Sequence, residues 1–196
     1  MPSKERRARQ RADVRARIIG AASTVLVGEG IAALTMRRVA HDVEYTPPVI
    51  YQHFANKDAL VGELVRQGYG ELVRQLDAAA QEAPDLDARL TGVAAAYLRF
   101  AAENVHLFDA MNSSSLPDGE RRAAAEPVIG VVWDLMSTWA QTHRVELDVG
   151  AACEIIWGTL LGIATLGRLD TVDGDRARRL GVDALRLLLQ GWRAAA

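Results

Sequence analysis

The stretch TMRRVAHDVEYTPPVIYQHFANKD, residues 35–58, contains two short helical patterns separated by a tight turn. Thr35 and Thr46 each precede one of these patterns, and threonine is a good N-cap residue. Pro47 follows Thr46 at the first helical position, where an N–H has no intrahelical partner to lose. The two helices and the turn at 43–46 are typical of a helix-turn-helix.

Outside this stretch the sequence is helical nearly throughout. Ala, Leu, Arg and Glu dominate, apolar residues recur at three- and four-residue steps, and no alternating strand pattern is present. The apolar face of the first helix consists of Ile18, Ala22, Val25 and Leu26, and Gly28 and Gly30 end that helix. The expected helices cover about 10–29, 35–42, 47–54, 57–82, 86–103, 105–111, 119–143, 148–168 and 175–193, with a loop at 112–119. This pattern predicts an all-α fold of about nine helices.

Composition limits the class of protein. The chain has 196 residues, of which 49% are apolar and 24% charged, as in ordinary globular proteins. We expect no membrane segment, because no apolar run approaches the roughly 20 residues that span a bilayer. The N-terminus lacks the apolar core of a signal peptide, and the single Cys153 cannot form an internal disulfide. A cytoplasmic chain is therefore expected.

Charge is distributed unevenly along the chain. Residues 1–60 carry ten Lys/Arg against six Asp/Glu, whereas residues 61–196 carry thirteen against nineteen. Within residues 1–17 there are seven basic and two acidic side chains. A basic head on an acidic body is expected when only the head contacts a polyanion, and the basic leader can then lie near phosphates. The alternative for residues 1–10 is a solvated, partly disordered leader.

The helix after the turn has the residues that a DNA major groove requires. Ile50 and Phe54 are four residues apart and are expected to pack inward with Val39, which leaves the other side chains exposed. Apolar side chains there can contact thymine methyl groups, and glutamine or histidine can hydrogen-bond base edges. Capped helix starts and a lysine can hold phosphates. The expected DNA contacts are Thr35, Arg37, Thr46, Pro47, Pro48, Val49, Tyr51, Gln52, His53 and Lys57. The alternative is that the aromatic residues of this helix belong only to the core.

These residues resemble the head of the TetR family of bacterial transcription regulators. In that family a helix ends in glycine, a threonine starts the next helix, and the recognition helix ends in Tyr-x-His/Tyr-Phe before Asn/Ser-Lys. The matching residues here are Gly30, Thr35, Ala40, Val43, Tyr51, His53, Phe54, Asn56 and Lys57. The chain departs from the family at Pro47-Pro48, where a polar or basic residue followed by a small one is commoner. The preferred operator therefore cannot be transferred from relatives.

The resemblance implies two domains. Residues 1–60 would form a three-helix DNA-binding domain with a basic N-terminal arm. Residues 61–196 would form a larger helical domain that binds a ligand and dimerises through its last two helices.

The last two helices have apolar faces suited to dimerisation. Small residues on one helix permit close approach, and the other carries an apolar stripe at helical spacing. The expected dimer contacts are Gly158, Gly162, Leu185, Leu188, Leu189 and Trp192. A homodimer with heads about 34 Å apart would read a palindromic operator in double-stranded DNA. The alternative is that both helices form only the monomer core.

Large side chains gather in the middle helices and could line a cavity for a small apolar ligand. The expected ligand-binding residues are Tyr97, Phe100, Phe108, Met111, Trp133, Met136, Trp157 and Leu161. The alternative is a plain core. The segment Trp157–Gly162 resembles the W-x-x-x-H-G motif of one TetR subgroup, but Leu161 stands in place of the histidine, which favours a more apolar ligand.

No pattern in the sequence indicates an enzyme. The chain has no glycine-rich phosphate loop, nucleophile elbow or His-x-x-x-His pair, so no catalytic residue, metal site or cofactor is expected. The expected function is a ligand-responsive transcriptional regulator, most simply a repressor released from DNA by its ligand. The alternative is a helical protein-interaction module without specific DNA binding.

Overall fold

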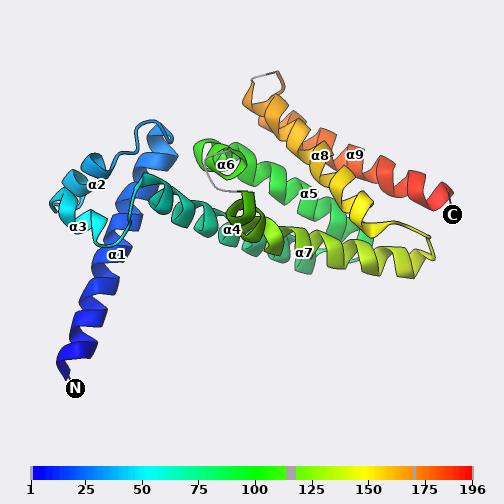
Figure 1. Cartoon of the computed structure of the whole chain (residues 1–196). Coiled ribbons are helices and arrows are strands. Elements are labelled where there is room, and N and C mark those ends of the chain that lie inside the picture. The colour runs from blue at the N-terminus through cyan, green and yellow to red at the C-terminus, as the bar shows by residue number, and fades with distance from the viewer. Residues whose placement is uncertain (1, 114–117, 170, 196) are drawn as a thin grey trace. The chain divides into compact units, whose positions relative to one another are not determined.

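The computed structural model describes residues 2–113, 118–169 and 171–195, and these form helices joined by turns, with no strand among them. The helices are α1 (Pro2–Glu29), α2 (Met36–Asp42), α3 (Pro47–Tyr51), α4 (Lys57–Glu82), α5 (Leu86–Glu103), α6 (Val105–Asn112), α7 (Asp118–His143), α8 (Val149–Arg168) and α9 (Gly174–Ala194) (Figure 1). The expected all-α fold of about nine helices is confirmed. The expected loop at 112–119 falls between α6 and α7, and residues 114–117 lie outside the described part of the chain.

The N-terminus differs from the sequence expectation, because α1 begins at Pro2 and not near residue 10. The leader consists largely of Lys, Arg, Glu, Gln and Ala, all of which have high helix propensity. Its charge therefore does not prevent helix formation, and the basic residues are presented on a helix that continues into the core.

Contacts divide the chain into two compact units. The first comprises the described residues of Met1–Gly68 and His106–Arg121, and the second those of Tyr69–Val105 and Arg122–Ala196. This division differs from the contiguous boundary expected near residue 60. The reason is that α6 packs on the first half of α4: a Cβ on Gly68 would lie 3.0 Å from Met111 Sδ and 3.1 Å from Leu107 Cδ1. The first unit thus includes a helix that is distant in sequence.

The core of the first unit is built from the faces that the sequence predicts. Ile18, Val25, Val39 and Ile50 are each at most 3% exposed. The chain leaves α1 through Gly30, whose φ of +82° is a left-handed conformation that glycine adopts without steric cost. In Figure 1, α2 and α3 lie against the C-terminal half of α1, and the N-terminal turns of α1 extend past them.

The helix caps explain where α2, α3 and α4 begin. Thr35 Oγ1 accepts a hydrogen bond from the Arg38 amide at 3.1 Å, and Asn56 Oδ1 accepts one from the Ala59 amide at 2.8 Å. Thr46 occupies the N-cap position of α3, but its side chain makes no capping hydrogen bond, contrary to expectation. Pro47 and Pro48 lack an N–H, and the Val49 amide donates instead to the Thr46 carbonyl oxygen at 2.9 Å. Backbone geometry and proline, without a side-chain cap, define this helix start.

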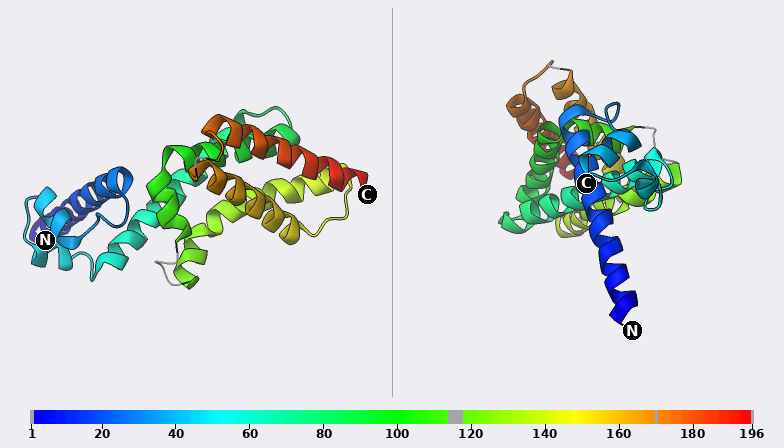
Figure 2. Two further views of the ribbon diagram at one scale, coloured as in Figure 1. Left: turned by 90° about the horizontal axis from the view of Figure 1, so that it is seen from above. Right: turned by 90° about the vertical axis from the view of Figure 1, so that its left-hand side faces the viewer.

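The second unit is a packed set of helices in which α5 contacts both α8 and α9. Helices α8 and α9 lie side by side (Figure 2). Close approach of α9 to α5 requires Gly181, because a Cβ there would overlap Leu98 Cδ1 and lie 3.2 Å from Leu160 Cδ2. Trp139 is fully buried, and its indole Nε1 donates to Asp87 Oδ1 at 2.7 Å. The same carboxylate oxygen accepts a hydrogen bond from Arg193 Nη2 at 2.7 Å, which ties α5, α7 and α9 together.

Helix α8 is more apolar than we expected. Over its most apolar 18 residues the mean hydropathy is 1.7, so by length and composition alone this 20-residue helix could cross a membrane. Only 28% of its apolar window is buried. Length and hydropathy do not distinguish a membrane-spanning helix from a helix whose apolar face binds protein. The exposed side chains of α8 are therefore described below with the surface to which they belong.

Candidate functional site

The ten residues expected to contact DNA lie on α2 and α3, at the starts and ends of these two helices, and at the start of α4. Ile50 is the buried residue of α3, so the other side chains of this helix point outward or lie at its edge. Tyr51 is 53% exposed, and Gln52 and Pro48 are also exposed. The remaining members are exposed or half-buried, namely Thr35, Arg37, Thr46, Pro47, Val49, His53 and Lys57. We call this set the reading surface.

Helix α3 is shorter than the sequence suggested. It ends at Tyr51, and Gln52 and His53 form a turn that leads to buried Phe54. The His53 and Phe54 amides both donate to the Ile50 carbonyl oxygen, at 2.9 Å and 3.0 Å. The turn therefore remains attached to the helix, and its two polar side chains lie at the helix end.

Two neighbouring arginines of α2 have different surroundings. Arg38 pairs with Asp42 and Glu29, each at 3.0 Å. Arg37 is exposed and makes no ion pair among the described residues, which leaves its guanidinium available to an anion.

Lys57 has a structural contact that the sequence did not indicate. Its ammonium donates a hydrogen bond to the Ile31 carbonyl oxygen at 2.7 Å, which fixes the chain segment after α1. An ammonium has three donors, so a phosphate can be bound by the remaining two.

Three arginines of α1 hold the reading surface from behind, and sequence reasoning missed this role. Arg11 Nη2 donates to the Gln52 carbonyl oxygen at 3.3 Å. Arg15 pairs with Glu63 at 2.8 Å, and its guanidinium lies 5.1 Å from the centroid of the Phe54 ring. Arg17 donates to the Val43 carbonyl oxygen at 3.1 Å and lies 5.2 Å from the Tyr45 ring centroid. The available signal was the four-residue step from Arg11 to Arg15, which places both on the face that becomes the core.

These contacts determine the charge state of two nearby groups. Partial burial, together with Arg11 and Arg15, lowers the pKa of His53, so a neutral imidazole with one donor and one acceptor is favoured. Burial alone would raise the pKa of Glu63, but hydrogen bonds from Arg66, Arg15 and Gln67 lower it to about 2. The carboxylate that anchors Arg15 is thus ionised at neutral pH.

The eight residues expected to bind ligand do not form one cluster within either unit. Tyr97, Phe100 and Met136 are buried in the second unit, where Leu161 is half-buried. Trp133 and Trp157 are each 46% exposed. Phe108 and Met111 are buried in the first unit.

Tyr97 supplies a polar point among these apolar side chains. Burial raises the pKa of its hydroxyl, and a hydrogen bond from the Trp157 side chain opposes this shift. The side-chain amides of Asn104 and Asn112 donate to their own helices, at the carbonyl oxygens of Phe100 and Phe108. An indole has a single N–H donor, and Trp157 uses it in this hydrogen bond.

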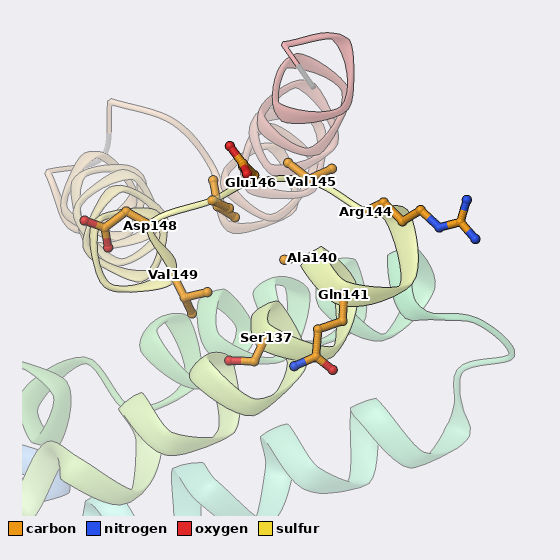
Figure 3. A pocket seen from close by; sticks show the side chains of 9 residues that line it. Ser137, Ala140, Gln141, Arg144, Val145, Glu146, Asp148 and Val149 are labelled. Carbon is orange, nitrogen blue, oxygen red and sulfur yellow. The ribbon is translucent and has the colours of Figure 1, made fainter.

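Two hollows on the described part of the second unit are lined by none of the eight residues. One, of about 830 Å³, lies where α7 turns into α8 and is lined by Ser137, Ala140, Gln141, Arg144, Val145, Glu146, Leu147, Asp148 and Val149. In Figure 3 the chain arches over Ala140 while Arg144 extends away from the hollow. The other, of about 390 Å³, lies between α8 and α9 and is lined by Thr159, Ala184, Leu187, Leu188, Gly191 and Trp192.

The structure changes which residues can form a dimer interface. Leu185 and Leu189 are only 3% and 2% exposed, so they belong to the core of the second unit and are not available to a partner in this conformation. Their α9 neighbours Leu188 and Trp192 are half-buried and line the groove between α8 and α9.

The exposed apolar surface lies mostly beside the predicted stripe. On α8, Gly158 and Gly162 are exposed, and a Cβ on either would have no described atom within 4 Å beyond the helix itself. The large apolar side chains left exposed on α8 and α9 are Ile155, Trp157, Leu166, Leu180 and Leu187. Sequence periodicity pointed to the most apolar stripe of α9 as the dimer contact. In the structure, Leu185 and Leu189 of that stripe are buried in the core of the protomer.

The described residues contain no cluster of side chains that could hold a metal ion, and their cysteine is poorly suited to act as a nucleophile. No group of three or more His, Cys, Asp or Glu side chains that could hold a metal ion occurs among them. Cys153 is buried, and burial raises the pKa of its thiol to about 11, which disfavours the thiolate.

Comparison with known proteins agrees with this geometry. Residues 18–64 match the family model described as bacterial regulatory proteins, tetR family, and residues 90–185 match the tetracyclin repressor-like C-terminal domain. No curated protein in the comparison matches the chain.

Several solved structures have the same fold. A protein of unknown function from Rhodococcus sp. RHA1 has a TM-score of 0.80 at 20% identity, covering 91% of this chain and 95% of that one. The transcriptional regulator FadR from Bacillus subtilis, in complex with stearoyl-CoA, has a TM-score of 0.75 at 20% identity, with 90% and 98% covered. A bacterial regulatory protein of the tetR family from Rhodococcus RHA1 has a TM-score of 0.70 at 21% identity, with 91% and 96% covered.

The first family model spans the reading surface, and the second covers most of the helices of the second unit. This chain is therefore a member of the TetR family, a helix-turn-helix transcriptional regulator and not an enzyme.

Proposed function

We propose that this chain is a homodimeric repressor that leaves a palindromic operator when a small apolar molecule binds. The observation that carries the proposal is the reading surface, whose exposed side chains are held from behind by Arg11, Arg15 and Arg17. A rigid support of this kind is needed where side-chain positions must match base edges.

The reading surface assigns a role to each kind of side chain. Pro47, Pro48 and Val49 would contact thymine methyl groups, and Gln52 and His53 would hydrogen-bond base edges. The phosphate contacts would come from Thr35, Arg37, Thr46, Tyr51 and Lys57. Because the double proline removes polar groups from the start of α3, base recognition depends mainly on the helix end.

Dimerisation would use the exposed apolar face of α8 and α9. The contacts would be Gly158, Gly162, Leu188 and Trp192, together with Leu187 and the other exposed apolar side chains of these helices. A second copy would cover the apolar surface of α8, which explains its hydropathy without a membrane and fits a cytoplasmic regulator. Two heads about 34 Å apart, or a multiple of this, would meet a palindromic site.

Residues 1–60 would act as the DNA-binding domain and residues 61–196 as the ligand-binding and dimerisation domain. Helix α4 contributes residues to both compact units, so a ligand that prefers one arrangement of the body could alter the spacing of the two heads. A coupling of roughly 1–3 kcal/mol would change operator affinity about 5- to 150-fold.

The ligand would be apolar and would contact the Tyr97–Trp157 pair. Apolar character is supported by Leu161 in place of a histidine and by the buried side chains of Phe100 and Met136 in the same unit. A fold relative, FadR of Bacillus subtilis, was solved in complex with stearoyl-CoA, so long-chain acyl-CoA esters are the first compounds to test.

The decisive experiment selects duplexes from a random-sequence library with the full chain and compares two variants on the enriched sequence. Gln52→Ala is expected to change the preferred base at one position of each half-site, at a cost of about 1–3 kcal/mol. Lys57→Ala is expected to weaken binding to enriched and random duplexes alike and to lower the salt dependence.

The competing interpretation is a helical protein-interaction module without specific DNA binding. It predicts that no sequence is enriched and that any retardation of DNA is the same for all duplexes. Equal losses for both variants on enriched and random DNA would contradict the roles given to Gln52 and Lys57.

A further inference from the structure

The N-terminal turns of α1 carry a cationic stripe along one face. At about 100° per residue, four basic side chains with steps of three, four and four residues fall within about 80° of arc. These are Lys4, Arg7, Arg11 and Arg15. The acidic residues of the same segment, Glu5 and Asp13, point roughly 100° and 180° away from Lys4. The stripe therefore presents positive charge only.

The same face of α1 becomes the core face further along the helix. Ile18, Ala22 and Val25 continue the three- and four-residue steps and are each at most 3% exposed. Helix α1 extends past α2 and α3 (Figure 1), and by its residue spacing the stripe continues the face on which the helix-turn-helix packs.

The contacts of Arg11 and Arg15 show which side of the helix-turn-helix the stripe faces. Arg11 donates to the Gln52 carbonyl oxygen, and Arg15 lies against Phe54 and Glu63. Both contacts are at the end of the recognition helix where Gln52 and His53 are located. Arg7 and Lys4, one and two turns further out than Arg11, are exposed on the same side.

We propose that Lys4, Arg7 and Arg11 form a phosphate-binding rail that contacts the DNA backbone outside the bases read by α3. Seven residues from Arg11 to Lys4, at about 1.5 Å each, give a reach of about 10 Å. A DNA strand advances about 3.4 Å per phosphate along the axis, so the rail spans about three base pairs. It adds affinity and register without sequence preference, because phosphates are the same at every step.

This inference rests on the proposed DNA binding by the reading surface. It adds that the contact with the DNA backbone extends about three base pairs beyond the bases read by α3. The chain offers a matched control on the same helix. Arg6 and Arg9 are exposed and lie about 140–200° from Lys4, on the opposite side. The variants Lys4→Gln/Arg7→Gln and Arg6→Gln/Arg9→Gln remove the same charge and keep good helix-forming residues.

The test uses the full chain and a duplex enriched from a random-sequence library, with ten flanking base pairs on each side. Affinity is measured at several salt concentrations. Loss of two phosphate contacts should reduce the slope of log affinity against log salt by about 1.8 per head. This slope difference corresponds to about 60-fold weaker binding per head at 0.1 M salt relative to 1 M salt. Arg6→Gln/Arg9→Gln should retain most of the wild-type slope.

Hydroxyl-radical footprinting gives a second measurement. The wild-type footprint should exceed that of Lys4→Gln/Arg7→Gln by about three base pairs at each outer end, and trimming those base pairs should weaken only the wild type. Equal slopes for the two double variants, or equal footprints, would overturn the rail while leaving the reading surface intact. Failure of the wild type to enrich any sequence would overturn the proposed function as well.

Discussion

Replacing Leu187 by glutamine is expected to separate the proposed dimer into folded protomers. Leu187 lies on α9 beside the groove toward α8 and is 68% exposed. Full burial of a leucine contributes about 1.5–3 kcal/mol, so burying the remaining two-thirds would contribute about 1–2 kcal/mol per copy. A two-fold interface buries this residue twice, which gives about 2–4 kcal/mol and a roughly 30- to 1,000-fold rise in the dimer dissociation constant.

Two further variants make this measurement specific. Leu189→Gln changes the same residue type two positions away, but Leu189 is 2% exposed, so this variant should lower the free energy of unfolding by about 2–5 kcal/mol. Val27→Gln changes a 46% exposed residue of the first unit and should leave dimerisation unchanged. Sedimentation equilibrium measures the dissociation constant, and urea unfolding measures the stability. If Leu187→Gln dimerises as tightly as Val27→Gln, the α8–α9 face is not the interface.

Two more predictions concern stability. Glu63 has a pKa of about 2 in the folded chain and an ordinary value of 4.5, so its ion pairs stabilise the fold fully above about pH 4.5 and lose this effect as the pH falls toward 2. Urea midpoints compared at pH 6 and pH 3 should therefore differ less for Glu63→Gln than for the wild type, and an unchanged difference would refute the assignment. Gly181→Ala places a methyl group against Leu98, and overpacking of about 1–3 kcal/mol should exceed the gain of about 1 kcal/mol from helix propensity. Gly130→Ala, with no neighbouring atom within 4 Å of the added group, should instead stabilise α7, and a Gly181→Ala chain as stable as Gly130→Ala would show that Leu98 repacks without cost.

Much of the fold could be predicted because its signals are local. Asn56 and Thr35 cap their helices as expected, and the positions of α4 and α5 follow from cap residues and apolar periodicity alone. The reading surface was also predictable, since the burial of Ile50 determines which of its helical neighbours are exposed. In each case the deciding interactions join residues within a few positions of one another.

Other features depended on contacts between distant parts of the chain. The roles of Arg11 and Arg15 require knowing that α1 passes behind α3, and the contact of Lys57 with Ile31 requires knowing how the chain leaves α1. Sequence spacing gives the face on which a side chain lies, but it does not give the partner of that face.

The last helix makes the distinction clear. The sequence by itself determined that α9 is an amphipathic helix with leucines at helical spacing, because periodicity is a property of one segment. Only the tertiary structure decided that Leu185 and Leu189 face the monomer core while Leu187 remains exposed. Both faces are apolar, and an apolar side chain is stabilised by burial against either surface. Helices α5 and α8 pack on α9, with Gly181 at a point of close approach, and this packing determines which face of α9 is buried within the protomer.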